Sequence, residues 1–304
     1  MITYFKRTKK GQKLETLKEY SKDCWIKVID PNEDEIKFLV DEFKLEKENI
    51  VDGLDVYENS RIESDEGIVY SYLRVPRYSG QESTSSFLFV FAKNCIITIA
   101  KEELGMFDKL TGSSGFFTNK RTKTFLQILS YISRSYNKNV LKILKEVKKD
   151  KRNILRLNNK DILDLVLQED ILNDYLSSFS PLIDLCKNII KIRVMKFDED
   201  ETEFIEDLII DLDQTLNTCN SALKTISNMR DYYSTTLNHN LNKNITILTV
   251  FTIFLAIPTL LAGIYGMNIK LPFQGNSGLF WILSGIIVLI WIISLTIFKK
   301  TKVF

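Results

Sequence analysis

Hydrophobic residues are distributed unevenly along the chain. From residue 1 to about residue 240, charged and polar residues interrupt the apolar ones every few positions, whereas almost all of the last sixty or so residues are apolar. Residues 245–265 and 279–298 contain no charge, and about twenty such residues are needed to cross a hydrocarbon core of roughly 30 Å. The pattern predicts two transmembrane helices. Buried helices of a soluble core would normally keep a polar face, whereas these stretches carry only hydroxyl groups.

The N-terminal part alternates between strand-like and helix-like patterns. Residues 24–30, 67–75 and 86–100 are rich in β-formers, and the last run is expected to fold as a hairpin about Lys93 and Asn94. Residues 31–43 and 48–57 are expected to form helices that follow a strand. We therefore predict a cytoplasmic α/β domain over residues 1–117.

The chain becomes helical beyond this domain. We predict a cytoplasmic helical segment over residues 118–200, with helices over 120–150 and 160–197. The second of these is expected to break near Ser180 and Pro181, because proline disfavours helix at the residue before it.

A much longer helix is expected over residues 201–265. This segment has no proline before Pro258 and no glycine before Gly263, so it can form one helix of about 97 Å at 1.5 Å per residue. Its cytoplasmic part, residues 201–244, is expected to be a stalk, and residues 245–268 the first transmembrane helix.

Two different faces of this long helix carry regular patterns. A near-heptad apolar stripe, which favours packing against neighbouring helices, comprises Ile205, Ile209, Leu212, Leu216, Cys219, Leu223, Ile226, Tyr233, Leu237 and Leu241. A polar face comprises Ser221, Lys224, Asn228, Asp231, Thr235, Asn238 and Asn242, and it continues through the apolar stretch as Ile245, Thr249, Thr252, Ala256, Thr259 and Gly263. This continuous row is either a water-facing seam or a solvated surface followed by threonines that bond their own backbone carbonyls.

Charge distribution predicts the orientation in the membrane. The N-terminus has no apolar core of signal-peptide length, so the large N-terminal part is expected to stay in the cytoplasm. The outer loop, residues 269–278, contains one basic residue, Lys270, whereas the tail, residues 299–304, contains three, Lys299, Lys300 and Lys302. Basic residues favour the cytoplasmic side. We expect a multi-pass protein of the cell membrane with both termini inside.

Several kinds of chemistry are disfavoured. The four cysteines form no CxxC pair and His239 is the single histidine, so a disulfide framework or a Cys/His metal site is not expected. No Walker A pattern or GxGxxG context is present, and neither apolar stretch holds an ionisable side chain. We expect neither an enzyme nor an ATP-driven pump, and no nucleic-acid partner.

The first apolar stretch ends in Tyr265-Gly266-Met267-Asn268. Gly266 frees the backbone to leave the helix, and Tyr265 suits the headgroup zone. Mg²⁺ holds six oxygens and gives up water reluctantly. A ring of neutral Asn268 amides at a pore mouth could therefore contact the hydrated ion without the deep trap of a carboxylate ring. Helix C-termini at the same mouth would also favour cations.

This tetrapeptide, at the end of the first of two C-terminal stretches and after a very long helix, resembles the signature of the CorA family of magnesium channels. The resemblance implies a funnel-shaped homopentamer that carries hydrated Mg²⁺, with Co²⁺ and Ni²⁺ as further candidates, down its electrochemical gradient. Residues 265–268 would form the selectivity filter. The implied pore residues are Asp231, Asn242, Thr249, Thr252 and Thr259, with a hydrophobic constriction at Ile245, Leu248 and Ala256.

The resemblance also implies regulation by cytosolic Mg²⁺ bound between subunits. Asp52 and Asp207 match the regulatory carboxylates of the family, although each could equally belong to a solvated charged surface. Acidic residues crowd the start of the stalk, where divalent ions would relieve repulsion: Asp198, Glu199, Asp200, Glu201, Glu203, Glu206 and Asp207. The outer loop departs from the family, because it lacks an acidic residue and carries Lys270 near its start, so we expect a weaker attraction for cations at the mouth.

Two alternatives remain from the sequence. The chain could be a transporter of Zn²⁺ or another divalent ion from the same superfamily, because a ring of Asn268 amides would suit those hydrated ions too. The intact Met267 favours the magnesium branch. A membrane-tethered helical sensor or scaffold is an alternative of another class. Anchoring alone gives no reason for the threonine row or for Asn268.

Overall fold

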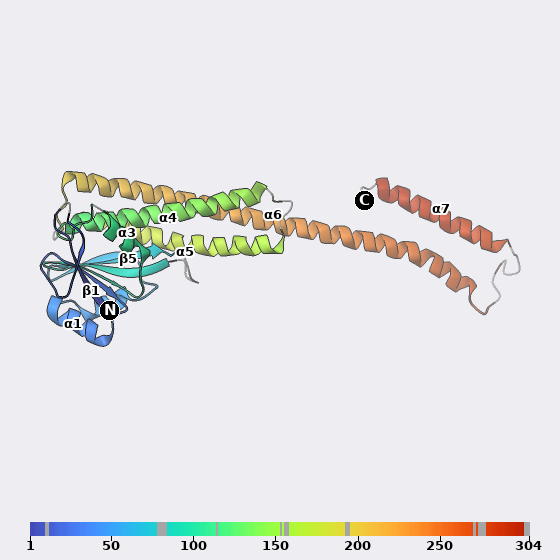
Figure 1. The fold of residues 1–304 in the computed structure, drawn as a ribbon. Helices are drawn as coiled ribbons and strands as arrows, with labels where there is room; N and C mark the ends of the chain where they lie inside the picture. The colour runs from blue at the N-terminus through green and yellow to red at the C-terminus, as the bar shows by residue number, and fades with distance from the viewer. Residues whose placement is uncertain are drawn as a thin grey trace. The chain divides into compact units, whose positions relative to one another are not determined.

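The computed structural model describes the chain except residues 10–11, 78–83, 114, 153, 155–157, 192–194, 270–271, 273–277 and 301–304, and except the side chains of residues 295 and 297–300. It divides into two compact units, Met1–Asn228 and Met229–Phe304. Figure 1 shows the elements of both units, coloured in chain order.

The first unit is built on a seven-stranded mixed sheet. Its strands lie in the order β2-β1-β3-β7-β6-β5-β4. The central pair β3 and β7 is parallel, and the other neighbouring pairs are antiparallel. The strands are β1 (Ile2–Lys6), β2 (Glu15–Leu17), β3 (Trp25–Ile29), β4 (Arg61–Asp65), β5 (Ile68–Pro76), β6 (Thr84–Phe91) and β7 (Ile96–Ala100).

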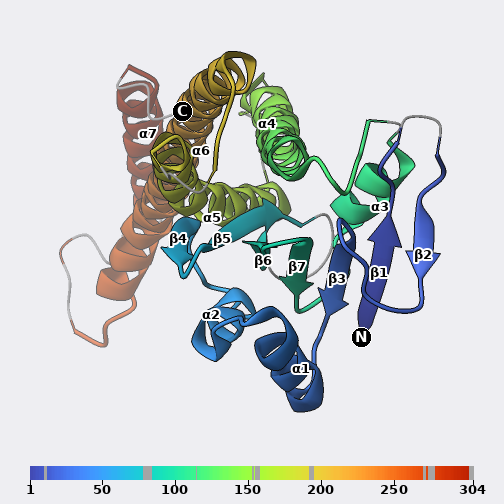
Figure 2. The same ribbon diagram turned by 90° about the vertical axis from the view of Figure 1, so that its left-hand side faces the viewer.

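Helices cover both faces of this sheet. On one face, α1 (Glu33–Phe43) and α2 (Lys47–Gly53) bury Leu39 and Ile50 against Tyr70 and Leu88. On the other lie α3 (Gly105–Gly112), α4 (Arg121–Arg152) and α5 (Asn159–Ile189), as Figure 2 shows. Successive residues of a strand point to opposite faces of the sheet. Each strand therefore contributes side chains to the apolar core on both faces.

Several helices begin with reciprocal side-chain caps. Asn32 and Glu35 form a capping box at the start of α1, and Asn158 with Asp161 does the same for α5. Such caps satisfy amide groups that the first helical turn leaves unpaired. They fix where each helix begins on the sheet.

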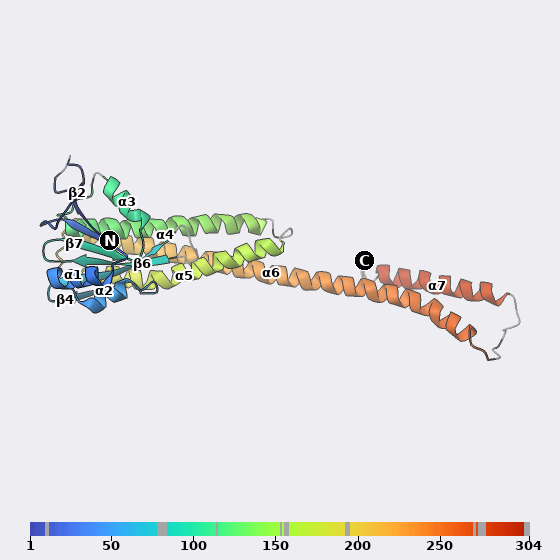
Figure 3. The same ribbon diagram turned by 60° about the horizontal axis from the view of Figure 1, so that its bottom comes forward.

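The helix α6 (Glu199–Tyr265) is continuous over 67 residues. Within the first unit it packs beside α4 and α5 (Figure 3), and Cys219 Sγ donates to the carbonyl of Leu172 on α5 at 3.3 Å. The buried side chains on this part of α6 repeat at three- and four-residue steps: Ile205, Leu208, Leu212, Thr215, Cys219, Ala222 and Ile226.

The second unit contains the rest of α6 and α7 (Leu279–Lys300). The indole of Trp291 on α7 stacks on Phe254, with ring centroids 5.8 Å apart. Its Nε1 donates to the Phe254 carbonyl at 3.1 Å. Four residues later in α6 stands Pro258, which has no N–H to bond that carbonyl. Trp291 therefore supplies the hydrogen-bond donor that the proline removes.

Within the described residues, α6 is the one helix long and apolar enough to cross a membrane, by length and composition. The apolar part of α7 within the described residues, Leu279–Ser294, is shorter than a spanning helix of that kind. The second transmembrane helix predicted from the sequence therefore stays a prediction.

The predicted strands, their hairpin and the long helix are confirmed, since β6 and β7 flank Lys93 and Asn94 and α6 runs unbroken to Tyr265. The predicted break near Ser180 and Pro181 is wrong, because α5 runs through Pro181. Side chains on either side of this proline are buried, and their packing outweighs one lost helical bond. The helix predicted to reach residue 197 ends at Ile189.

Candidate functional site

The predicted filter lies where the chain leaves α6. The helix ends at Tyr265, and a turn follows in which the Gly266 N–H donates to Ala262 O at 2.8 Å and the Met267 N–H to Ile264 O at 3.3 Å. A Cβ on residue 266 would lie 3.0 Å from Ala262 O, closer than ordinary van der Waals contact. Glycine therefore permits the tight turn that carries Asn268.

Asn268 is exposed just beyond this turn. Its side-chain amide has no hydrogen-bond partner within the part of the chain that the structure describes, so both its carbonyl oxygen and its amino group are available. Lys270, expected to weaken the attraction for cations, lies outside the described residues.

The threonines of the predicted seam bond their own helix. The hydroxyls of Thr249, Thr252 and Thr259 donate to backbone carbonyls one turn earlier at 2.8–2.9 Å. The local hydrogen bonding expected from the sequence is thus present. Each hydroxyl oxygen still keeps lone pairs for accepting hydrogen bonds. Water molecules around a cation point their hydrogens outward, so acceptors suit a hydrated ion.

This seam faces away from α7. Phe254, which Trp291 covers, fixes the direction of α7 around the α6 axis. At about 100° per residue, Thr249, Thr259 and Gly263 lie about 140° to 180° around the helix from Phe254. The hydroxyl row and the contact with α7 therefore occupy opposite faces of α6.

Part of the seam lines an open hollow of about 870 Å³ along α6. Its polar or small lining residues are Thr252, Ala256, Thr259 and Gly263, and Met267 of the motif also lines it. The remaining lining is apolar, so the threonine hydroxyls supply its polarity.

The other predicted pore residues are exposed on α6 below this hollow. Asp231 and Asn242 project from the helix, and Ile245 and Leu248 of the predicted constriction are 61% and 65% exposed. Within one chain, nothing described covers these two apolar side chains.

The predicted regulatory carboxylates are not brought together within one chain. Asp52 lies on α2, on the face of the sheet opposite the helices that pack with α6 (Figure 2), and Asp207 is exposed on α6. Among the described residues, no group of three or more His, Cys, Asp or Glu side chains is placed to hold a metal ion. The regulatory role of Asp52 and Asp207 therefore stays a prediction.

Asp52 instead pairs with a residue that the sequence interpretation missed. Arg61 Nη2 donates to Asp52 Oδ2 at 2.8 Å, and Arg61 also binds Glu58 and Glu63. Arg61 and Glu63 are two residues apart on a strand and therefore lie on one face. This spacing is the sequence feature from which their pairing could have been predicted. The approach of Asp52 from α2 depends on the tertiary fold.

The acidic start of α6 has a structural role. Asp198 Oδ1 accepts from the Glu201 N–H at 2.7 Å, and Glu201 Oε2 accepts from the Asp198 N–H at 3.4 Å. Glu201 also accepts from the Thr122 hydroxyl at 3.2 Å. Carboxylates at a helix N-terminus interact favourably with its dipole. Two of the acidic residues predicted to attract divalent ions are therefore engaged in beginning the helix.

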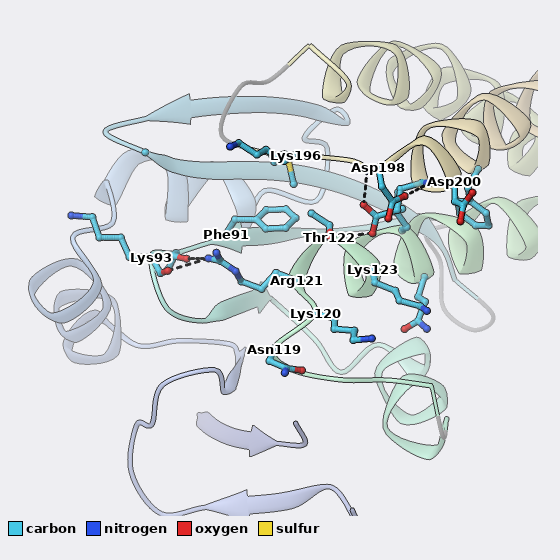
Figure 4. Close-up of a pocket in the computed structure, with 17 residues that line it drawn as sticks. Phe91, Lys93, Asn119, Lys120, Arg121, Thr122, Lys123, Lys196, Asp198 and Asp200 are labelled. Atoms are coloured by element: carbon cyan, nitrogen blue, oxygen red, sulfur yellow. Dashed lines mark hydrogen bonds between the residues drawn. The ribbon is translucent and has the colours of Figure 1, made fainter. Parts of the chain in front are cut away.

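A cavity of about 970 Å³ adjoins this helix start (Figure 4). Arg121 lies at its centre and donates to the carbonyls of Ala92 and Lys93 at 2.5 and 3.2 Å. Its lining mixes both charges, since it includes four lysines and the carboxylates of Asp198, Asp200 and Glu201. The Arg121 contacts join the β6–β7 hairpin to the first turn of α4.

Known proteins resemble the whole chain. Residues 21–300 match the family described as CorA-like Mg²⁺ transporter protein. The chain is 25% identical over 288 residues to the cobalt/magnesium transport protein CorA of Methanocaldococcus jannaschii, covering 91% of this chain and 90% of that protein. It is 24% identical over 299 residues to the magnesium transport protein CorA of Campylobacter jejuni strain RM1221, with the same coverage.

A solved structure shares the fold. The complete structure of the CorA magnesium transporter from Methanocaldococcus jannaschii matches with a TM-score of 0.83 at 22% identity, covering 99% of this chain and 98% of that one. The α/β domain and the long helix are therefore a known architecture.

Proposed function

We propose that this chain, which belongs to the CorA-like Mg²⁺ transporter family, is a channel subunit that passes hydrated Mg²⁺ through the cell membrane down its electrochemical gradient. The names of its relatives support transport of Mg²⁺, with Co²⁺ as a further cargo. The observation that carries the proposal is Asn268, a neutral, exposed amide that a glycine turn holds at the end of the threonine row.

We further propose a homo-oligomer, a pentamer by resemblance, in which α6 lines the pore and α7 is a second transmembrane helix outside it. The opposite positions of the threonine row and of Trp291 around α6 support this arrangement. So does the exposure of Ile245 and Leu248 in a single chain, because apolar side chains of that size need lipid or protein around them. Both termini would be cytoplasmic.

The mechanism follows from the chemistry of these side chains. A ring of Asn268 oxygens accepts hydrogen bonds from the water around Mg²⁺, which spares the ion the cost of losing that water. Neutral amides select without holding the cation as tightly as a carboxylate ring. Thr259, Thr249 and Asn242 then offer further acceptors along the pore, and Asp231 attracts the cation at the inner end.

Gating would use the cytoplasmic carboxylates. Mg²⁺ bound between Asp52 of one subunit and Asp207 of its neighbour would hold the subunits in a closed arrangement, with Ile245, Leu248 and Ala256 as the constriction. Asp52 belongs to α2 and Asp207 to α6, and α2 lies on the face of the sheet opposite the helices that pack with α6 (Figure 2), which supports a site shared between subunits. Loss of cytosolic Mg²⁺ would release the subunits and open the pore.

The direct test is Mg²⁺ uptake into liposomes that contain the purified full chain. Asn268→Ala should reduce uptake at least tenfold, because the amide oxygens that contact the hydrated ion are lost. Asn244→Ala, which removes an exposed amide from α6 away from the threonine row, is the matched control and should leave uptake unchanged. Absence of uptake by the unaltered protein, or full uptake by Asn268→Ala, would contradict the channel and favour the sensor or scaffold.

The same liposomes test gating. With high Mg²⁺ inside, Asp52→Ala and Asp207→Ala should each raise uptake severalfold, since an intersubunit ion loses one of its ligands. Asp41→Ala on α1 removes an exposed carboxylate of the same domain and should have no effect. If all three variants behave like the unaltered protein, Asp52 and Asp207 belong to the solvated surface. Repeating the assay with Co²⁺ and Zn²⁺ ranks the cargo ions.

A further inference from the structure

Three carboxylates hold the side chain of Arg61 at the β4 edge of the sheet. Its Nη2 donates to Asp52 Oδ2 at 2.8 Å, its Nε donates to Glu63 Oε1 at 2.9 Å, and its Nη1 binds Glu58. Each of the three guanidinium nitrogens thus donates to a different carboxylate. Asp52, the proposed regulatory ligand, therefore already has a cation beside it.

An aromatic ring keeps this guanidinium in place. Arg61 Cζ lies 3.9 Å from the centroid of the Tyr72 ring, and the two residues are cross-strand partners on β4 and β5. The Tyr72 hydroxyl donates to Asn49 Oδ1 on α2 at 2.9 Å, so the ring is fixed as well. A cation over a tyrosine face gains electrostatic stabilisation. Arg61 would thus keep its position if one carboxylate left.

The charge of this cluster suits exchange between cations. Burial alone would lower the pKa of Arg61, but its hydrogen bonds to the three carboxylates raise that pKa, so the guanidinium stays charged. The carboxylates Asp52, Glu58 and Glu63 leave the cluster with a net negative charge. The Asp52 side chain is 47% exposed, so a solvated ion can reach its second oxygen.

We propose that Arg61 is the internal counter-ion that sets the Mg²⁺ concentration at which Asp52 binds its regulatory ion. Mg²⁺ takes the Asp52 carboxylate from the guanidinium, while Arg61 stays on Glu58, Glu63 and Tyr72. Arg61 is a positioning residue that competes with Mg²⁺ and does not bind it. The inference rests on the regulatory role proposed for Asp52.

The test compares inhibition of Mg²⁺ uptake by internal Mg²⁺ in liposomes containing the full chain. Arg61→Gln removes the competing charge, so the half-inhibitory Mg²⁺ concentration should fall about tenfold, the size expected for one charged hydrogen bond. Uptake without internal Mg²⁺ should not change. Arg61→Lys keeps the charge and should lie closer to the unaltered protein. Arg77→Gln, which breaks an arginine pair with Glu102 elsewhere in the domain, is the matched control.

A second variant moves the threshold the other way. Glu63→Gln removes a half-exposed carboxylate from the cluster, which leaves Arg61 more dependent on Asp52 and should raise the half-inhibitory concentration severalfold. Because this side chain is on the surface, the variant should fold even if Arg61→Gln does not. An unchanged threshold in the variants that fold, or a rise in Arg61→Gln, overturns the inference.

The two proposals fail in different ways. If the unaltered protein takes up no Mg²⁺, or is insensitive to internal Mg²⁺, the proposed function or its gating is wrong and the inference falls with it. If the unaltered protein is inhibited and its threshold does not depend on Arg61, only the inference is wrong. Arg61→Gln combined with Asp52→Ala should show no shift beyond that of Asp52→Ala alone.

Discussion

The two parts of α6 share one helix but have different surroundings. In the first unit, Ile205, Leu212 and Cys219 are fully buried against the chain's own helices. Beyond Asn228, Ile245, Leu248 and Leu260 are each more than 60% exposed although they are equally apolar. The first part completes its core within one subunit. The second leaves these apolar side chains exposed within one subunit.

This difference shows where each property of the helix is determined. In the first unit, burial against the chain's own helices fixes the rotation of α6 about its axis. In the second unit, Trp291 covers Phe254, so the threonine row lies on the face of α6 opposite α7. The packing of the stalk and the direction of the threonine row therefore depend on different contacts, each within its own unit.

The sharpest test of this contrast is a matched pair of leucine truncations. Leu212→Ala removes a fully buried side chain and should lower the free energy of unfolding by about 3 kcal/mol. Leu241→Ala removes a side chain that is 50% exposed in a single chain and should cost less than about 1 kcal/mol. Chemical denaturation of the full chain in detergent gives both values. Equal costs would mean that copies of the chain bury Leu241 as fully as α4 and α5 bury Leu212.

Cysteine labelling tests which face of the second part contacts water. Thr259→Cys should react with a water-soluble thiol reagent at least ten times faster than Phe254→Cys, because Trp291 covers residue 254. The four native cysteines give a low background. They are buried, and burial raises the pKa of Cys95 and Cys186 to about 12 and that of Cys219 to about 11. Near neutral pH few of them are reactive thiolates. Faster reaction at residue 254 would reverse the proposed arrangement.

The same contrast explains what the sequence could predict about α6. The stripe was right at Ile205, Leu212, Cys219 and Ile226, which are buried. Between them the structure buries Leu208, Thr215 and Ala222, whereas the predicted Ile209, Leu216 and Leu223 are half-buried. The predicted and the observed rows of buried positions lie side by side on α6 and repeat with nearly the same spacing. The positions of α4 and α5, which a single-helix pattern does not contain, decide which row faces inward.

Local signals were reliable where local chemistry decides. The turn after Tyr265 follows from a glycine whose replacement would crowd a carbonyl, and the hairpin at Lys93 and Asn94 follows from its flanking strands. Pro181 misled because packing around α5 overrides a local preference. The Arg61 cluster joins α2 to β4 and β5, so no stretch of sequence displays it. The predicted roles of Asn268, Asp52 and Asp207 stay predictions until flux is measured.

The smallest expected effect concerns the joint between the two helices of the second unit. Pro258 leaves the Phe254 carbonyl without its usual helical donor, and the Trp291 indole replaces that donor at 3.1 Å. Trp291→Phe keeps an aromatic ring but loses the hydrogen bond, which should cost about 1 kcal/mol in a detergent unfolding titration. Trp281→Phe, at a position that is 75% exposed on α7, should cost less.

The double variant decides whether the hydrogen bond is responsible. Pro258→Ala restores an N–H that can bond the Phe254 carbonyl within α6. In that background Trp291→Phe should cost little, because the carbonyl keeps a donor. If Trp291→Phe costs the same with and without Pro258, the indole stabilises α7 by its ring contact alone. Apolar packing would then hold α7, as it holds the first part of α6. The two parts of α6 would differ only in which helices pack against them.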